Sequence, residues 1–162
     1  MSDEPCYDVA HLGHVEIFTN KPEESLDFFV NVYGLTESGR EGNSVYLRAF
    51  DDYEYHTLKL TTSDTTGVGH IGYRCSSQAA LERRVAVIEE MGCGKGWIDG
   101  DLGHGRAYQF TDPDGHLFEL YFDTREYLAP PEEQPALKNI AQRYHGRGDS
   151  VRRIDHLNML AR

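Results

Sequence analysis

The strongest constraint on how this 162-residue sequence can fold is an internal repeat. Residues 10–62 predict the order strand, helix and three strands, and residues 67–123 predict the same order again. In the first strand of each module, LGHVEIF aligns with VGHIGYR and places His14 over His70. In the last strand, HTLKL aligns with HLFEL and places Lys59 over Glu119. A duplication of this kind predicts two modules related by a pseudo-twofold axis.

Each module has one helix and four short strands, which together predict an α+β fold. Asn20 is the predicted cap of the first helix, which Gly34 ends, and Ser76 or Ser77 is the predicted cap of the second, which Gly92 ends. Alternating apolar residues and β-formers mark the strands. We therefore expect residues 8–124 to form one domain in which eight strands wrap into a half-open barrel.

The remainder of the chain differs from the two modules. Residues 125–150 are rich in proline and charge, which predicts a linker, with one short helix near residues 136–144. Residues 151–162 then match the opening strand, with Ile-Asp-His-Leu over Leu-Gly-His-Val, so that His156 lies over His14. This match predicts that residues 151–162 are the opening strand of a third module.

Composition excludes several classes of partner. The net charge is −11, and a field of that sign repels nucleic acid and anionic membranes. The sequence contains no apolar run approaching the ~18 residues of a membrane span, and its first ten residues lack the pattern of a signal peptide. We therefore expect a cytoplasmic protein. With three cysteines and no Cys-x-x-Cys, any metal chemistry is expected to use histidine and carboxylate ligands.

The repeat selects three candidate metal ligands. His14 and His70 open equivalent strands, and Glu119 lies in the last strand of the second module. Two imidazoles and one carboxylate on one face form the triad typical of non-haem Fe(II) sites that react with O₂, although Mn(II), Zn(II) and Ni(II) accept similar ligands. The alternative is that duplication has left these residues as structural remnants. Lys59 at the position of Glu119 indicates one metal site rather than two.

The other polar motifs have structural interpretations. The turn at residues 112–115 has Pro and Gly where a tight turn requires them, and it aims the strand that carries Glu119. His104 lies between glycines and is interpreted as a loop histidine without a catalytic role, as are four further histidines. These are His11, His56, His116 and His145.

Several segments, in order, resemble a known family. GHVEI, SLDFFVNVYGL, VYLRAFD, DPDGHLFELYFD and VRRIDHLNMLA are similar to segments of two-domain extradiol ring-cleavage dioxygenases, especially catechol 2,3-dioxygenases. That family belongs to the vicinal-oxygen-chelate superfamily, which also contains glyoxalases and bleomycin resistance proteins and is built from paired βαβββ modules. The resemblance covers essentially all 162 residues, as an N-terminal domain and the first strand of a catalytic domain.

The resemblance implies cleavage of a catechol beside its two hydroxyls by Fe(II) and O₂, in a homo-oligomeric enzyme without nucleic-acid or membrane partners. The first iron ligand of that family lies in the motif matched by RIDHLNM, which implies His156. The remaining ligands and the catalytic residues would lie beyond Arg162, so the 162 residues alone are expected to be inactive.

Two alternatives remain open at this point. In the first, the chain is a single-domain vicinal-oxygen-chelate metalloprotein with its own site at His14, His70 and Glu119, acting as a small dioxygenase, a glyoxalase-like lyase or a resistance protein. In the second, it is a non-catalytic assembly domain.

Overall fold

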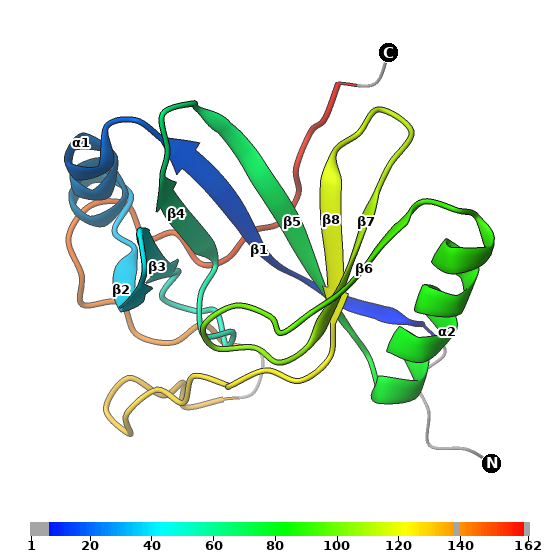
Figure 1. The fold of residues 1–162 in the computed structure, drawn as a ribbon. Coiled ribbons are helices and arrows are strands. Elements are labelled where there is room, and N and C mark those ends of the chain that lie inside the picture. Colours follow the sequence, from blue (N-terminus) through cyan, green and yellow to red (C-terminus); the bar gives the residue numbers. More distant parts are fainter. Residues whose placement is uncertain (1–6, 138–139, 161–162) are drawn as a thin grey trace.

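The computed structural model describes residues 7–137 and 140–160. Eight strands, two α-helices and one π-helical turn follow one another along the chain (Figure 1). In order they are β1 (Val9–Thr19), α1 (Pro22–Asp27), η1 (Phe28–Val32), β2 (Thr36–Glu41), β3 (Ser44–Arg48), β4 (Leu58–Thr62), β5 (Gly67–Cys75), α2 (Gln78–Glu90), β6 (Gly94–Ile98), β7 (Ala107–Thr111) and β8 (Leu117–Tyr121).

The strands form one mixed sheet in the order β2-β3-β4-β1-β5-β8-β7-β6. Each module contributes four neighbouring strands, and the antiparallel pair β1 and β5 joins the modules at the centre. The edge strands β2 and β6 do not pair with each other, so the sheet curves without closing. The predicted α+β fold of two βαβββ modules in a half-open eight-stranded barrel is confirmed.

The strand register reproduces the alignment of the two modules. In the parallel pair β1 and β4, Glu16 lies beside Lys59, and in the parallel pair β5 and β8, Gly72 lies beside Glu119. Because Glu16 aligns with Gly72 and Lys59 with Glu119, the same two positions are neighbours in both modules. The second module thus has a carboxylate where the first has an ammonium group.

The two faces of the sheet differ in polarity because successive side chains of a strand point to opposite faces. Val15, Leu47, Ile71 and Phe118 belong to an apolar core on the outer face, against which side chains of α1 and η1 pack. A second apolar cluster lies between the sheet and α2. Alternate residues of the same strands face the inside of the barrel, and there they are mostly polar.

The helix caps differ in part from those predicted. Lys21, not Asn20, occupies the cap position of α1 and makes no side-chain capping bond. Instead Thr19 Oγ1 accepts the Lys21 N–H at 3.0 Å and bonds to Ser25 Oγ at 2.8 Å. For α2 the structure decides between the two predicted caps, since Ser77 Oγ accepts the backbone N–H of Ala80 at 2.9 Å.

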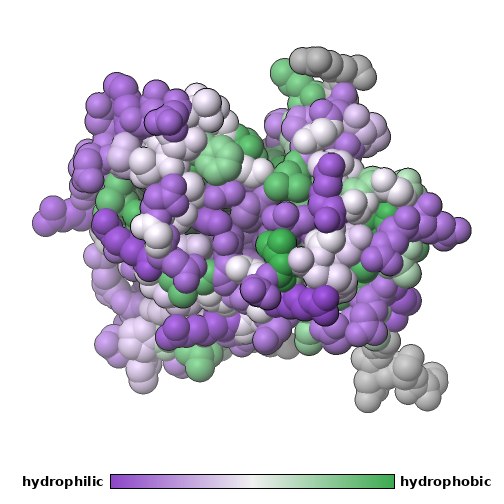
Figure 2. All heavy atoms as spheres, in the orientation of Figure 1, coloured by the Kyte–Doolittle hydropathy of each residue, from purple (hydrophilic) through white to green (hydrophobic). Residues whose placement is uncertain are grey.

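After β8, residues 125–137 and 140–160 form no helix and no strand. The short helix predicted at 136–144 is absent from the described part of that range; residues 138 and 139 lie outside the described residues. Residues 151–160 are likewise unpaired, and the assignment of residues 151–162 to a second domain remains a prediction. Met159 and Leu160 expose apolar side chains where Figure 2 shows a hydrophobic patch beside the C-terminus.

Among the described residues the longest helix is α2, with 13 residues, and no helix is both long and apolar enough to cross a membrane. The helices lie on the outside of the sheet (Figure 1).

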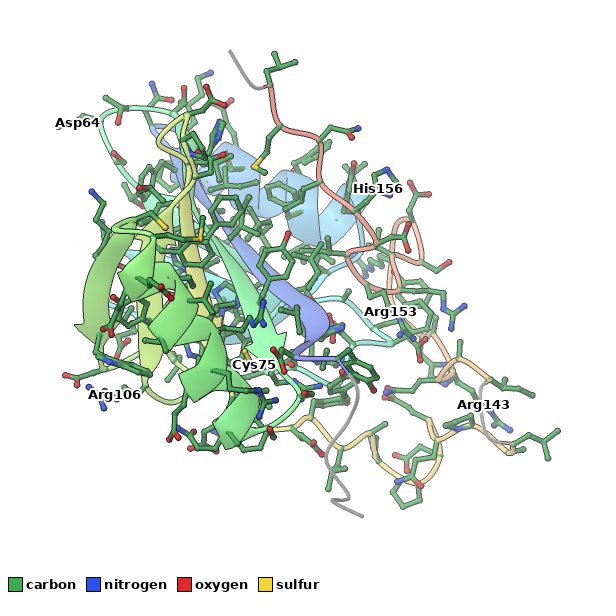
Figure 3. The ribbon with its side chains drawn as sticks, turned by 90° about the vertical axis from the view of Figure 1, so that its right-hand side faces the viewer. Asp64, Cys75, Arg106, Arg143, Arg153 and His156 are labelled. Atoms are coloured by element: carbon green, nitrogen blue, oxygen red, sulfur yellow. The ribbon has the colours of Figure 1, made fainter. Side chains whose placement is uncertain are left out.

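Asp51 anchors the C-terminal segment to the barrel through Arg152 and through Arg153, which Figure 3 labels. Its carboxylate, 8% exposed, accepts hydrogen bonds from Arg152 at 2.6 and 3.0 Å and from Arg153 at 3.1 Å. Burial by itself would raise the pKa of Asp51, but the Gln142 N–H and both guanidinium groups outweigh burial and lower it. The stabilisation is therefore present above about pH 4 and is lost as the pH falls through the lowered pKa.

Asp51→Asn should release this segment. Removing the ion pairs, worth up to ~1 kcal/mol, predicts about fivefold faster tryptic cleavage after Arg152 or Arg153, followed by mass spectrometry. Asp64→Asn, in the exposed loop between β4 and β5, is the matched control and should leave the cleavage rate unchanged. Equal rates in both variants would show that Asp51 does not hold the segment.

Candidate metal centre

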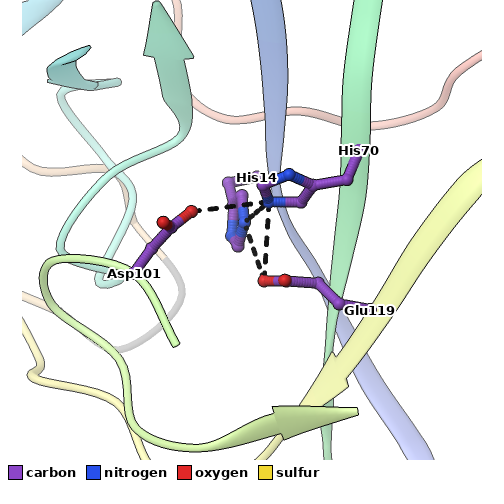
Figure 4. A group of neighbouring side chains, drawn as sticks. All are labelled: His14, His70, Asp101 and Glu119. Carbon is purple, nitrogen blue, oxygen red and sulfur yellow. Dashed lines mark hydrogen bonds and ion pairs between the residues drawn. The ribbon is translucent and has the colours of Figure 1, made fainter. Parts of the chain in front are cut away.

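Four potential metal ligands meet inside the barrel (Figure 4). His14 comes from β1, His70 from β5 and Glu119 from β8, and their side chains are almost completely buried. Asp101, from the loop between β6 and β7, is the fourth. One donor atom from each residue lies within 4.8 Å of the others. The structure thus brings together the three residues that the repeat selected and adds one carboxylate.

The donor atoms point toward a common centre. His14 Nε2 lies 3.0 Å from His70 Nε2 and 3.2 Å from Glu119 Oε1. His70 Nε2 lies 3.6 Å from Glu119 Oε1 and 3.5 Å from Asp101 Oδ2. Ligands at about 2.1 Å from a metal, in adjacent octahedral positions, are about 3.0 Å apart. The observed separations are close to that value, so the residues fit a divalent metal ion.

The carboxylates support the same interpretation. Neither Glu119 oxygen, nor Asp101 Oδ2, makes a hydrogen bond to a described residue, although all three atoms are buried. Buried polar atoms are usually hydrogen-bonded, whereas Glu119 Oε1 has only the imidazole nitrogens of His14 and His104 nearby, each at 3.2 Å and outside hydrogen-bond geometry. With neutral histidines, the cluster formed by Glu16, Asp101, Glu119 and Lys59 carries three negative charges and one positive charge, which a divalent cation would neutralise.

Glu16 orients His70. Glu16 Oε2 lies 2.9 Å from His70 Nδ1, which assigns the proton to Nδ1 and leaves Nε2 free to face the cluster. Burial by itself would raise the pKa of Glu16, but the hydrogen bonds from His70 and Thr61 outweigh burial and lower it to about 2. For His70, burial acts to lower the pKa, yet the bond to Glu16 raises it. Metal binding at His70 would therefore compete with a proton.

The other two members of the triad have shifted pKa values in the directions that ligands need. Burial lowers the pKa of His14, which favours the neutral imidazole. Burial by itself would raise the pKa of Glu119, but the imidazoles of His104 and His14 outweigh it and hold the carboxyl well below its usual range. Both groups thus have the protonation state of a metal ligand at neutral pH.

Two further histidines, which were interpreted as having no catalytic role, lie beside this cluster. His104 Nε2 lies 3.2 Å from Glu119 Oε1, and its ring stacks on Tyr121 at 4.3 Å. His56 is 3% exposed, and the centroid of its ring lies 4.4 Å from that of the His14 ring. Neither nitrogen of the His56 ring makes a hydrogen bond to a described residue. The sequence does contain a signal for the position of His104, because the glycines on either side of it allow the loop to turn into the barrel.

The remaining histidines lie elsewhere. His11 Nε2 lies 3.4 Å from Asp52 Oδ1. His116 Nδ1 makes a hydrogen bond of 2.7 Å to Asp112 Oδ2 at the predicted turn. His145 is exposed. His156, labelled in Figure 3, has a side chain that is 74% exposed and does not join the cluster.

Gly72 provides the space that the His14 ring occupies. A Cβ at this position would lie 2.3 Å from His14 Cε1 and 2.6 Å from its Nε2. Gly72→Ala should therefore displace the ring and weaken Mn(II) binding about tenfold or more, measured by electron paramagnetic resonance. Val68→Ala, on the same strand with a 60% exposed side chain, is the control and should bind as the unmodified chain does. Unchanged affinity in Gly72→Ala would exclude His14 as a ligand.

Comparison with known proteins identifies the family. Residues 11–120 match the glyoxalase/bleomycin resistance protein/dioxygenase superfamily. The chain belongs to this superfamily. It is 50% identical over 157 residues to a metapyrocatechase from Geobacillus stearothermophilus, a match that covers 97% of this chain and 48% of the relative. It is also 35% identical to a manganese-dependent 2,3-dihydroxybiphenyl 1,2-dioxygenase from Geobacillus genomosp. 3, covering 94% of this chain and 49% of that protein.

Solved structures agree with this relationship. A variant of homoprotocatechuate 2,3-dioxygenase from Brevibacterium fuscum superimposes with a TM-score of 0.71 at 27% identity, over 78% of this chain and 36% of that one. The enzyme of the same name from Arthrobacter globiformis superimposes with a TM-score of 0.70 at 26% identity, over 78% of this chain and 40% of that one. The chain spans about half the length of the curated relatives it matches.

Proposed function

We propose that this chain forms the first half of an extradiol dioxygenase that cleaves a catechol with O₂ at a mononuclear Fe(II) centre. The observation that carries the proposal is the 50% identity to a metapyrocatechase over 97% of the chain. A match of that extent includes the linker and the C-terminal segment as well as the barrel. The proposal includes a cytoplasmic, homo-oligomeric enzyme and extends to manganese as an alternative metal, since one relative is named as manganese-dependent.

His156 is the residue of this chain that we assign to the catalytic metal. Its side chain is exposed, and its one bond to a described residue runs from Nδ1 to Asp155 at 3.0 Å, which leaves Nε2 facing away from these residues. The ion pairs of Asp51 with Arg152 and Arg153 hold the preceding residues against the barrel. When bound, Fe(II) would supply open coordination positions for substrate and O₂.

The experiment joins residues 1–162 to the second half of the Geobacillus stearothermophilus metapyrocatechase. The purified protein is loaded anaerobically with Fe(II) and mixed with catechol and O₂. We expect the yellow absorbance of a muconic semialdehyde to appear. A folded, iron-loaded protein without turnover would reject the proposal.

A second candidate function rests on a separate observation. Both oxygens of Glu119 and Oδ2 of Asp101 make no hydrogen bond to a described residue, and they lie beside His14 and His70. We propose that the barrel itself binds one divalent metal ion through these residues, as a single-domain vicinal-oxygen-chelate protein would. Glu16 orients His70, and Lys59 bonds Asp101 Oδ1 at 2.7 Å. A small dioxygenase, a glyoxalase-like lyase and a resistance protein are the activities such a site could serve.

Metal analysis of the 162-residue chain tests the second candidate. After loading with Fe(II), Mn(II) or Zn(II) and desalting, we expect one ion per chain by mass spectrometry. Metal-free protein that nonetheless self-associates in analytical ultracentrifugation would instead favour a non-catalytic assembly domain.

A further inference from the structure

A pocket outside the barrel interior contains two arginines. It lies between the start of β2, the end of β3 and the segment after β8, and has a volume of about 440 Å³, within the range of small-molecule sites. Its lining residues include Ser38, Arg48, Tyr55, Arg125 and Tyr127. None of the candidate metal ligands, nor His156, contributes to it.

Arg48 is buried without an acidic partner. Arg48 is only 6% exposed, yet no carboxylate of a described residue lies within ion-pair distance of its guanidinium group. Nη1 donates to the carbonyl oxygens of Ala49 at 3.0 Å and Phe50 at 3.1 Å. The guanidinium lies 3.4 Å from the ring centroid of Tyr127. Burying a charge away from its counter-ions is unfavourable. Burial accordingly lowers the pKa of Arg48, and the charges of Asp52 and Glu133, which lie beyond ion-pair distance, compensate for burial only in part.

The unused donors of Arg48 are accessible from the pocket. Nε and Nη2 make no hydrogen bond to any described residue, and neither is among the buried atoms that lack a partner. These atoms are therefore the part of the guanidinium that remains reachable, and the pocket is the cavity that Arg48 lines. A guanidinium edge with two parallel N–H groups matches the two oxygens of a carboxylate or phosphate.

Arg125 adds a second positive charge to the same pocket. Its guanidinium lies 5.1 Å from the centroid of the Tyr55 ring and has no ion pair with a described residue. Tyr55 is itself fixed, because its hydroxyl donates to Ser38 O at 2.5 Å. Two acidic residues also line the pocket: Glu37 is held by two bonds from Arg40, and Glu126 is exposed.

We propose that this pocket binds an oxyanion, the carboxylate or phosphate group of a small molecule, between Arg48 and Arg125. The anion supplies the counter-charge that Arg48 lacks, and its two oxygens accept from Nε and Nη2. The exposed Arg125 side chain completes the site from the solvent side. The inference is independent of the metal centre and of ring cleavage.

Calorimetric titration of the 162-residue chain at low ionic strength tests the proposal, with inorganic phosphate and benzoate as the two probes. We expect saturable binding of at least one probe at one site, weakened about tenfold or more in Arg125→Gln. Arg48→Lys keeps the positive charge but loses the two parallel N–H donors of the guanidinium group, and it should weaken binding similarly. Which probe binds more tightly distinguishes the phosphate class from the carboxylate class.

Arg106→Gln is the matched control. Arg106 also stacks on an aromatic ring, with its guanidinium 4.1 Å from the centroid of Trp97, but it lies outside the pocket. Binding in this variant should equal that of the unmodified chain. Absence of saturable binding for both probes, or equal losses in Arg125→Gln and Arg106→Gln, would overturn the proposal.

Discussion

Replacing His70 with alanine should abolish stoichiometric metal binding by residues 1–162. His70 Nε2 lies 3.0 Å from His14 Nε2 and faces both carboxylates, so its loss opens one side of the donor set. Because losing an outer partner of a ligand already costs about 10–100-fold in affinity, losing the ligand itself should cost more than about a hundredfold. The measurement is the dissociation constant for Mn(II), by electron paramagnetic resonance or equilibrium dialysis.

His116→Ala is the matched control, since His116 lies in the turn before β8 and bonds Asp112 rather than the cluster. It should bind metal as the unmodified chain does. Circular dichroism shows whether His70→Ala retains the fold, and His70→Asn provides a smaller change if it does not. Full metal occupancy in a folded His70 variant would reject the barrel site.

Replacing His156 with alanine in the joined enzyme described above should lower the rate of ring cleavage by about a thousandfold or more. Replacing a residue that only hydrogen-bonds to a metal ligand typically lowers metal affinity or activity by ~10–100-fold, and replacing the ligand itself is expected to lower activity more. Iron content should fall in parallel. The measurement is the initial rate of yellow product formation under saturating catechol, together with iron per chain.

His145→Ala, an exposed histidine of the linker, is the control and should keep the full rate. A His156→Ala enzyme that retains its rate and its iron would show that the C-terminal segment does not reach the catalytic metal.

The repeat allowed the core of the site to be predicted from sequence. A β-strand alternates its side chains, so equivalent positions on β1 and β5 necessarily face the same side of the sheet, and Glu119 follows from the register beside Gly72. His14, His70 and Glu119 lie together in the structure, as the repeat predicts. The repeat also explains Lys59, whose position beside Glu16 mirrors that of Glu119 beside Gly72.

Asp101 and His104 escaped prediction because they lie on a loop, where no periodicity relates sequence to direction. Gly103, with φ of +100°, makes the turn that brings His104 inward, and a Cβ there would lie 2.3 Å from the Tyr55 side chain. Such a conformation depends on packing between distant residues. His56 was missed for a similar reason, since it precedes β4 and its burial depends on neighbours from other strands.

The C-terminal segment shows a second limit of sequence patterns. Residues 151–160 have the alternation of a strand, but a strand also needs a partner for its backbone groups. Here Val151 and Ile154 pack on the outer apolar core instead. Among the described residues, a backbone hydrogen bond joins this segment to the barrel, from the N–H of Phe50 to the carbonyl oxygen of Val151 at 3.2 Å.

Catechol turnover should be compared between two proteins, residues 1–162 alone and the same residues joined to the second half of the metapyrocatechase, to locate the chemistry in the second half or in the barrel. With Fe(II) and O₂, we expect yellow product only from the joined protein, with loss in His156→Ala and retention in His70→Ala. Turnover by residues 1–162 alone, abolished by His70→Ala, would contradict this expectation and assign the chemistry to the barrel.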